Sequence, residues 1–193
     1  MTDDNDTPRR RRRKPRAITP AYLEKAALFY LERYASSSQN LKAVLRRKVW
    51  RAAREVEIDR DAADGWIDAV VAKLQRAGLL DDKAYAEMRV MSLRRQGESA
   101  RAIRMKLAAK GVDAETIVRA LDRQEDENDD LAAAIAYARR RRLGPFRAAA
   151  QRDERRDKDM AALARKGFGL EICRAVIDAS DEDELSERVA DRA

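Results

Sequence analysis

The stretch Ser99-Ala-Arg-Ala-Ile-Arg-Met-Lys-Leu-Ala-Ala-Lys-Gly111 has the pattern of one short, complete helix. Ser99 supplies a hydroxyl that can cap the helix, and Ile103 and Leu107 follow at one-turn spacing on a single apolar face. Lys110 lies where a positive charge suits the negative end of a helix, and Gly111 can end the helix in a left-handed conformation. The stretch therefore predicts a helix with a defined start and a defined stop.

The same arrangement occurs earlier in the chain. Residues at offsets 0, 4, 8 and 11 are Ser37, Leu41, Leu45 and Lys48 in the first copy and Ser99, Ile103, Leu107 and Lys110 in the second. The match includes the cap, the apolar face and the terminal cation, so each shared position has a physical purpose. The pattern therefore indicates an internal repeat.

A third copy follows in degenerate form. The run Ala161-Ala-Leu-Ala-Arg-Lys-Gly167 parallels Met105-Lys-Leu-Ala-Ala-Lys-Gly111, and Cys173 and Ile177 follow at the apolar positions of the second copy. This copy is longer, since twenty-two positions separate its glycine and lysine (144 and 166) where thirteen separate 97 and 110. We place the start of this insertion at Pro145-Phe146.

The chain as a whole is predicted to be all-α. Prolines occur only at 8, 15, 20 and 145. The proline-free run 21–144 is rich in Ala, Leu, Arg, Lys and Glu and shows no period-2 alternation. We expect an elongated array of three tandem three-helix repeats, at 20–80, 81–124 and 125–180. A disordered basic tail (1–19) precedes them, and an acidic tail (181–193), loose or forming a short frayed helix, follows. Because one such unit buries little surface alone, neighbouring units are expected to share apolar faces.

The composition excludes several kinds of chemistry. The chain has no histidine, one cysteine and seven glycines that form no phosphate-binding motif, which rules out a Ser-His-Asp triad, a His-ligated metal site and an internal disulfide. The pair Asp81-Asp82 could hold Mg²⁺ in principle, but these residues are interpreted as helix caps that need no metal. We therefore expect no enzyme activity, no cofactor and no metal ion.

The charge points to polyanionic partners. The formal net charge is +7, the pI is about 9.7, and the basic excess lies in the first two thirds of the chain. The run from Arg9 to Arg16 could contact nucleic acid or simply keep the chain in solution. No apolar run approaches the roughly 18 residues of a membrane span, and the single Cys173 suits a reducing compartment. We therefore expect a cytoplasmic protein.

Two blocks of sequence resemble a known family. Gly78-Leu-Leu-Asp-Asp-Lys-Ala-Tyr-Ala and Ile103-Arg-Met-Lys-Leu-Ala-Ala-Lys-Gly-Val112 are similar to motifs of RecX, the bacterial regulator of the RecA recombinase. The resemblance is strongest over about 64–124. It implies a cytosolic, non-enzymatic protein that binds the groove of the RecA–DNA filament. It also implies inhibition of ATP hydrolysis, strand exchange and coprotease activity, and so restraint of recombination and of the SOS response.

Basic residues on the second helices of the first two units, with Arg94 and Arg95 at the end of the preceding helix, are the candidate binding residues. In a stacked array, equivalent basic rows could line one groove and meet phosphates or carboxylates, for which arginine is well suited. The expected partner is a RecA filament on single-stranded DNA, with direct DNA binding also open, and the chain is expected to be a monomer. The candidates are Lys42, Arg46, Arg47, Arg51, Arg94, Arg95, Arg101, Arg104, Lys106 and Lys110.

Other interpretations stay open. Each of these cations, taken singly, could belong to an ordinary solvated helix face. The chain could instead be a general DNA-binding or architectural protein that acts through its basic tail and helices, and a Mg²⁺ nuclease has the least support. The remaining conspicuous side chains are expected in the core: Trp50, Trp66, Tyr85, Tyr137 and Cys173.

Overall fold

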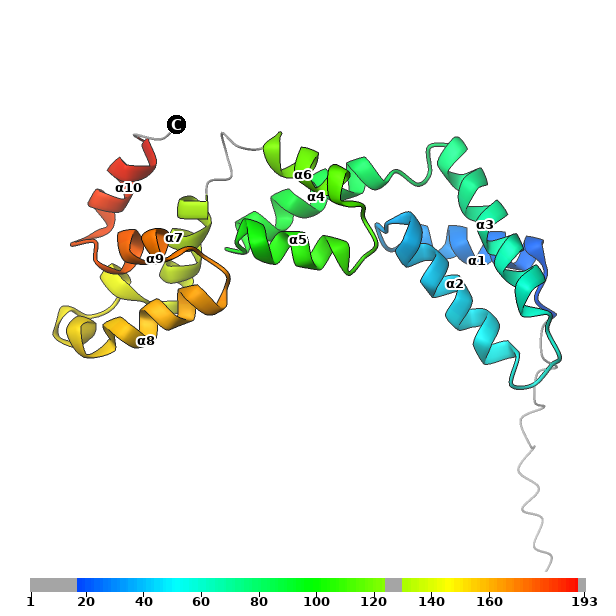
Figure 1. Ribbon diagram of the computed structural model, residues 1–193, viewed down its shortest axis with the longest axis horizontal. Helices are drawn as coiled ribbons and strands as arrows, with labels where there is room; N and C mark the ends of the chain where they lie inside the picture. Colours follow the sequence, from blue (N-terminus) through cyan, green and yellow to red (C-terminus); the bar gives the residue numbers. More distant parts are fainter. Residues whose placement is uncertain (1–16, 124–129, 191–193) are drawn as a thin grey trace, which may run out of the picture.

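A computed structural model describes residues 17–123 and 130–190, and all secondary structure in those ranges is helical (Figure 1). The helices form three groups that follow one another along the long axis of the molecule, so the prediction of an elongated all-α array of three-helix units is confirmed. Most of the expected basic tail, residues 1–16, and the expected boundary at 124–125 lie outside the described residues.

The first unit consists of α1 (Pro20–Leu31), α2 (Ser38–Ala52) and α3 (Arg60–Arg76). Side-chain oxygens of Thr19, Ser37 and Asp59 cap the three helices by accepting hydrogen bonds from first-turn amides. The cap expected at Ser37 is confirmed. Local sequence signals therefore set all three starts.

The second unit consists of α4 (Asp82–Arg95), α5 (Ala100–Ala108) and α6 (Ala114–Asp122). Their caps are Asp81, Ser99 and Asp113. Asp81 Oδ1 accepts hydrogen bonds from the amides of residues 83 and 84, at 2.8 and 3.1 Å, so its interpretation as a helix cap is confirmed.

The third unit consists of α7 (Asp130–Arg141), α8 (Arg152–Arg165) and α9 (Leu170–Ile177). Two 3₁₀ turns, η1 (Gly144–Phe146) and η2 (Ala149–Gln151), occupy the region of the predicted insertion. Asp159, only 3% exposed, fills a position that Ile103 has in the second unit. It accepts hydrogen bonds from the Gly144 amide at 3.0 Å and from Arg147, so a charged pair organises the insertion where the second unit has an apolar contact.

A tenth α-helix ends the described chain. Residues expected in an acidic tail form α10 (Glu182–Ala190), which lies beside the third unit (Figure 1). Leu185 is buried, at 1% exposed, and Arg188 donates a hydrogen bond to the carbonyl oxygen of Ala175 at 3.1 Å. Of the two forms considered for this segment, the described residues adopt the helical one, and one apolar side chain docks it.

Each unit has its own hydrophobic core. The three clusters of buried side chains lie within 18–80, 85–121 and 131–177, and they do not merge. The expectation that neighbouring units share apolar faces is therefore wrong. The reason is that Leu and Ile at one-turn spacing close each three-helix unit on itself, which leaves polar groups at the junctions.

The two junctions between units use the same pair of hydrogen bonds. The cap hydroxyl of Ser37 donates to the carbonyl of Lys110 in the second unit, and that of Ser99 donates to the carbonyl of Lys166 in the third, at 2.7 Å. The next amide in each case donates to the aspartate that begins the first helix of the following unit: Ser38 N to Asp82 Oδ1 at 2.6 Å, and Ala100 N to Asp130 Oδ1 at 2.8 Å. The repeated serine and lysine thus join consecutive units.

Close approach at these junctions requires glycine after the lysine. Gly111 has φ +73°, and a Cβ placed there would lie 2.3 Å from the Cβ of Gln39 in the first unit. Gly167 has φ +90°, and its Cβ would lie 2.7 Å from the hydroxyl of Ser99. The glycine that ends each helix is therefore also a contact between units.

No described helix is both long enough and apolar enough to cross a lipid bilayer.

Candidate functional site

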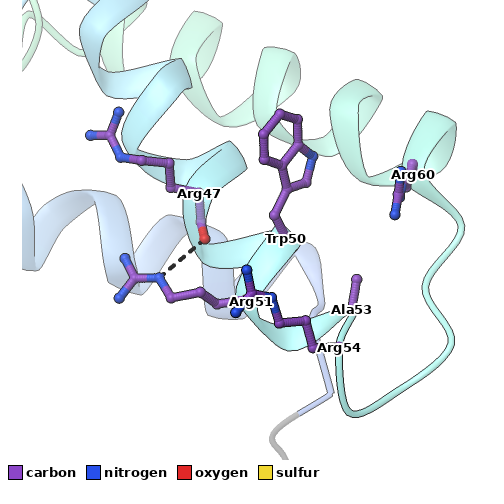
Figure 2. A pocket seen from close by; sticks show the side chains of 6 residues that line it. All are labelled: Arg47, Trp50, Arg51, Ala53, Arg54 and Arg60. Carbon is purple, nitrogen blue, oxygen red and sulfur yellow. Dashed lines mark hydrogen bonds between the residues drawn. The ribbon is translucent and has the colours of Figure 1, made fainter.

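The outer face of α2 carries an aromatic residue among arginines (Figure 2). Trp50 is 62% exposed, so the prediction that it belongs to the core is wrong. At 100° per residue, Trp50 lies about 140° around the helix from buried Leu45, and the exposed Arg47 and Arg51 lie on the same outer side. Trp50 was predicted to lie on or beside the apolar stripe of this helix, and its helical phase was the signal that would have placed it outside.

Arg60, the first residue of α3, completes this surface. Together with Ala53 and the α2 residues it lines an open groove of about 550 Å³. We call this the Trp50 groove, and its lining residues are Arg47, Trp50, Arg51, Ala53, Arg54 and Arg60. In Figure 2 the indole stands between the Arg47 and Arg60 side chains. Arg51 Nε donates to the Arg47 carbonyl at 3.2 Å, which holds one guanidinium along the groove.

Two other candidates of α2 are paired within the first unit. Lys42 Nζ lies 2.8 Å from Asp68 Oδ1, and Arg46 Nε lies 2.9 Å from Asp64 Oδ1. The hydrogen bond from Lys42 holds the pKa of the Asp68 carboxyl below its ordinary value. These two cations face α3 and tie it to α2, so the basic row of this helix divides into a paired side and an open side.

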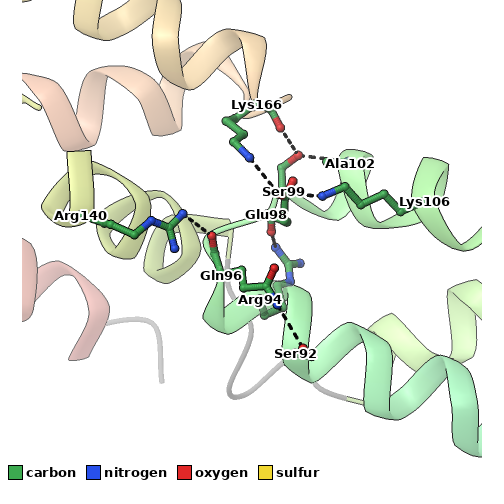
Figure 3. A network of polar contacts seen from close by, with 9 residues as sticks. All are labelled: Ser92, Arg94, Gln96, Glu98, Ser99, Ala102, Lys106, Arg140 and Lys166. Carbon is green, nitrogen blue, oxygen red and sulfur yellow. Dashed lines mark hydrogen bonds and ion pairs between the residues drawn. The ribbon is translucent and has the colours of Figure 1, made fainter. Parts of the chain in front are cut away.

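Two candidates of the second unit belong to the junction with the third unit (Figure 3). Arg94 is nearly buried, with a side chain 9% exposed, and pairs with Asp130. Lys106 Nζ lies 2.7 Å from Glu98 Oε1, and Lys166 Nζ reaches the same oxygen from the third unit at 2.8 Å. Burial favours a raised pKa for Glu98, but the hydrogen bonds and charges of the two lysines outweigh it and lower the pKa.

The remaining candidates are exposed. Arg95 and Arg101 form no ion pair with any residue in the described ranges. Arg104 borders an apolar groove of about 320 Å³ between α5 and α6, and Lys110 Nζ donates to Asn40 Oδ1 at 3.4 Å. The structure thus brings Arg47 and Arg51 together, and it distributes the other candidates over internal pairs, a junction and isolated exposed positions.

The other conspicuous side chains lie where the sequence placed them. Tyr85 and Tyr137 are each 8% exposed, Cys173 is fully buried, and Trp66 packs partly buried against the core of the first unit. Burial raises the pKa of the Cys173 thiol, so this group stays protonated at neutral pH.

Acidic side chains form no metal site in the part of the chain that the structure describes, where no group of three or more metal-binding residues occurs. Asp81 and Asp82, the pair weighed as a Mg²⁺ site, each serve a backbone amide: Asp81 caps α4, and Asp82 accepts from Ser38 in the first unit.

Known proteins are similar to this chain in sequence and in fold. The family model for the second three-helix domain of RecX matches residues 81–121. A regulatory protein RecX from Myxococcus xanthus is 46% identical over 169 residues, which cover 87% of this chain and 90% of that protein. A regulatory protein RecX from Agrobacterium fabrum is 32% identical over 170 residues, covering 88% and 89%.

A crystal structure of RecX from Lactobacillus salivarius has the same fold. It superposes with a TM-score of 0.60 at 22% identity, over 83% of this chain and 96% of that one. The fold, the repeat and the extended identity with curated relatives agree, and this chain belongs to the RecX family of regulatory proteins.

Proposed function

We propose that this protein binds the RecA filament on single-stranded DNA and inhibits its ATPase, strand-exchange and coprotease activities. In this way it would modulate recombination and the SOS response without catalysing a reaction. The observation that carries the proposal is the 46% identity with a regulatory protein RecX over 87% of the chain. Such a regulator would act by binding to a surface of the filament, so the residues that matter are those that form the contact.

The architecture supports binding to an extended partner. The units follow one another in line, and each closes its own core, so their outer faces are free to contact successive parts of a filament. Arg47, Arg51, Arg95, Arg101 and Arg104 are exposed cations on the first two units. Guanidinium groups bind both phosphates and carboxylates through paired hydrogen bonds, so either component of a nucleoprotein filament suits them.

The test is ATP hydrolysis and strand exchange by purified RecA on single-stranded DNA, with this protein added up to stoichiometric amounts. We expect both rates to fall as the protein is added, and unchanged rates at stoichiometry would contradict the proposal. The double variant Arg47→Gln/Arg51→Gln should inhibit less than the native chain. A matched control is Arg119→Gln, because Arg119 is an exposed arginine paired with Glu115 on its own helix.

A second function, general DNA binding, is favoured by the +7 charge and the run of arginines from 9 to 16. It requires tight DNA binding without RecA and a steep loss of affinity with added salt. Deleting residues 1–19 separates the two functions. Loss of DNA affinity with filament inhibition intact would make the tail an accessory and the repeats the effector, whereas loss of both would favour the DNA-binding function.

A further inference from the structure

We propose that the Trp50 groove of the first unit is a binding site for single-stranded nucleic acid. One unpaired base stacks on the Trp50 indole, and the phosphates on either side of it contact the surrounding arginines. This inference deepens the second function proposed above, general DNA binding, by giving it a site that needs no RecA protein. It can therefore fail or succeed independently of filament inhibition.

The indole is presented to solvent. Trp50 is 62% exposed, whereas Trp66, the other tryptophan of the chain, packs partly buried against the core of its unit. The face of an exposed indole can stack on any base, since every base has a π-face, and such stacking is the common element of sequence-tolerant single-strand sites. An exposed Trp50 thus supplies the part of the site that distinguishes bases from simple anions.

The arginines supply the part of the site that holds phosphates. Arg47 and Arg51 stand one helical turn apart on α2, Arg54 lies in the turn that follows this helix, and Arg60 is the first residue of α3 (Figure 2). None of these four guanidinium groups forms an ion pair with a residue of the described ranges, unlike neighbouring Lys42 and Arg46. Their charge is therefore available to an external anion.

The acidic residues of the same region do not neutralise this charge by direct contact. Glu55, Glu57 and Asp59 lie in the connection between α2 and α3, and Asp59 is engaged in capping α3. None of the ion pairs among described residues joins them to the groove arginines. The negative charges of these three residues still lie near the groove. A weakly charged ligand would therefore gain little binding energy, and the groove favours a strong polyanion.

Single-stranded nucleic acid fits this combination better than its rivals. A duplex offers the phosphates but hides the faces of its bases inside the stack. An acidic peptide could pair with the arginines but would leave the indole without a matching surface. The groove volume of about 550 Å³ lies within the range of small-ligand sites, roughly 300–1,000 Å³, so one nucleotide is a suitable occupant.

The experiment uses the fluorescence of Trp50 in the full-length chain. In a Trp66→Phe variant, Trp50 is the only tryptophan, so quenching of its emission reports occupancy of this groove alone. The probes are an oligothymidylate, an abasic oligonucleotide of equal length and a polyglutamate peptide, with total binding followed by anisotropy. We expect quenching by the oligothymidylate and none by the other two, because only the first carries bases.

Arginine variants of the same Trp66→Phe chain test the phosphate contacts. Arg54→Gln/Arg60→Gln should raise the midpoint of the quenching titration about tenfold and reduce the salt slope by roughly 1.4, about 0.7 per lost phosphate contact. Arg119→Gln, the matched control, should change neither. Circular dichroism checks that all variants keep their helices.

Three results would overturn the inference. One is binding of the oligothymidylate, seen by anisotropy, with no change in Trp50 emission. Another is equal quenching by the abasic oligonucleotide or by polyglutamate, which would make the groove a general anion site. The third is an unchanged midpoint in the double arginine variant.

Discussion

The junction between the second and third units contains more polar contacts than the junction between the first and second. Both have the serine hydroxyl on a lysine carbonyl and the amide on an aspartate. The second junction adds the Glu98 ion cluster, the Arg94–Asp130 pair and packing of α4 against α7. At the first junction the corresponding lysine, Lys110, reaches only the Asn40 amide at 3.4 Å.

This difference indicates how the three units are held together. Since the three cores are separate, the relative placement of the units depends on these polar contacts rather than on shared apolar surface. The two shared hydrogen bonds fix the register of each junction, and the added ion pairs strengthen the second one. We infer that the second and third units are held together more firmly than the first and second. The first unit, which carries the Trp50 groove, is therefore freer to move relative to the other two.

The largest expected effect comes from Gly97→Ala. Gly97 has φ +69°, and a Cβ there would lie 2.8 Å from Tyr137 Cβ and 3.0 Å from the Ala133 carbonyl oxygen. Because the contacted atoms belong to the backbone or to Cβ of α7, they cannot rotate away, and we expect a loss of about 3 kcal/mol in unfolding free energy. Urea unfolding measures it.

Gly78→Ala is the matched control for that change. Gly78 has the same φ, +69°, but no atom within 4 Å of its added Cβ. It should therefore cost only the backbone strain, about 1–2 kcal/mol. Equal losses in the two variants would mean that contact between α4 and α7 contributes nothing to stability.

Ser37→Ala and Ser99→Ala test the part that both junctions share. Each removes a helix cap and leaves a lysine carbonyl of the next unit without its donor. We expect about 2 kcal/mol from each, about 1 from the cap and about 1 from the unmatched carbonyl. Thermal unfolding with circular dichroism gives the values, and a large difference between the two losses would show that the serine hydrogen bonds of the two junctions are not equivalent.

Lys166→Met and Lys110→Met test the part that differs. Lys166 pairs with Glu98, whose side chain is 9% exposed. Loss of the Lys166 ammonium should therefore lower the free energy of unfolding by about 1 kcal/mol. Lys110 is exposed and its loss should stay below about 0.5 kcal/mol. The same urea titration compares them, and the reverse order would refute the proposed difference between the junctions.

The smallest effect is a pH dependence of the second junction. The lysines hold the folded pKa of Glu98 below its ordinary value, so its stabilising contribution is complete above the unfolded pKa of about 4.3. That contribution is lost as the pH falls through the lower, folded pKa. The stability gap between the native chain and Glu98→Gln should therefore shrink between pH 7 and pH 3 in urea titrations. A constant gap would contradict it.

The sequence predicted the local features of this fold well. Caps such as Ser37 and Ser99, and apolar pairs such as Ile103 and Leu107, act within one helix, so their spacing alone reveals them. The repeat was visible because the same serine and lysine recur. Their role in joining units was not visible, since Ser37 and Lys110 meet only after folding.

The candidate site was predicted less fully. Arg47 and Arg51 were predicted from their spacing, but Trp50, which was predicted to lie in the core because it falls on or beside an apolar stripe, is exposed. Arg94 and Lys106 looked equivalent to the other cations, and their engagement with Asp130 and Glu98 depends on residues of distant or preceding segments. Partners that folding brings together cannot be read from one-dimensional spacing.

The proposal with the widest consequences is that this array binds a RecA nucleoprotein filament more tightly than it binds nucleic acid alone. The most direct measurement is the equilibrium affinity of the full-length chain for RecA-coated single-stranded DNA and for the same DNA uncoated, at one salt concentration. Our account predicts tighter binding to the coated DNA. Equal or weaker binding to the filament would contradict it.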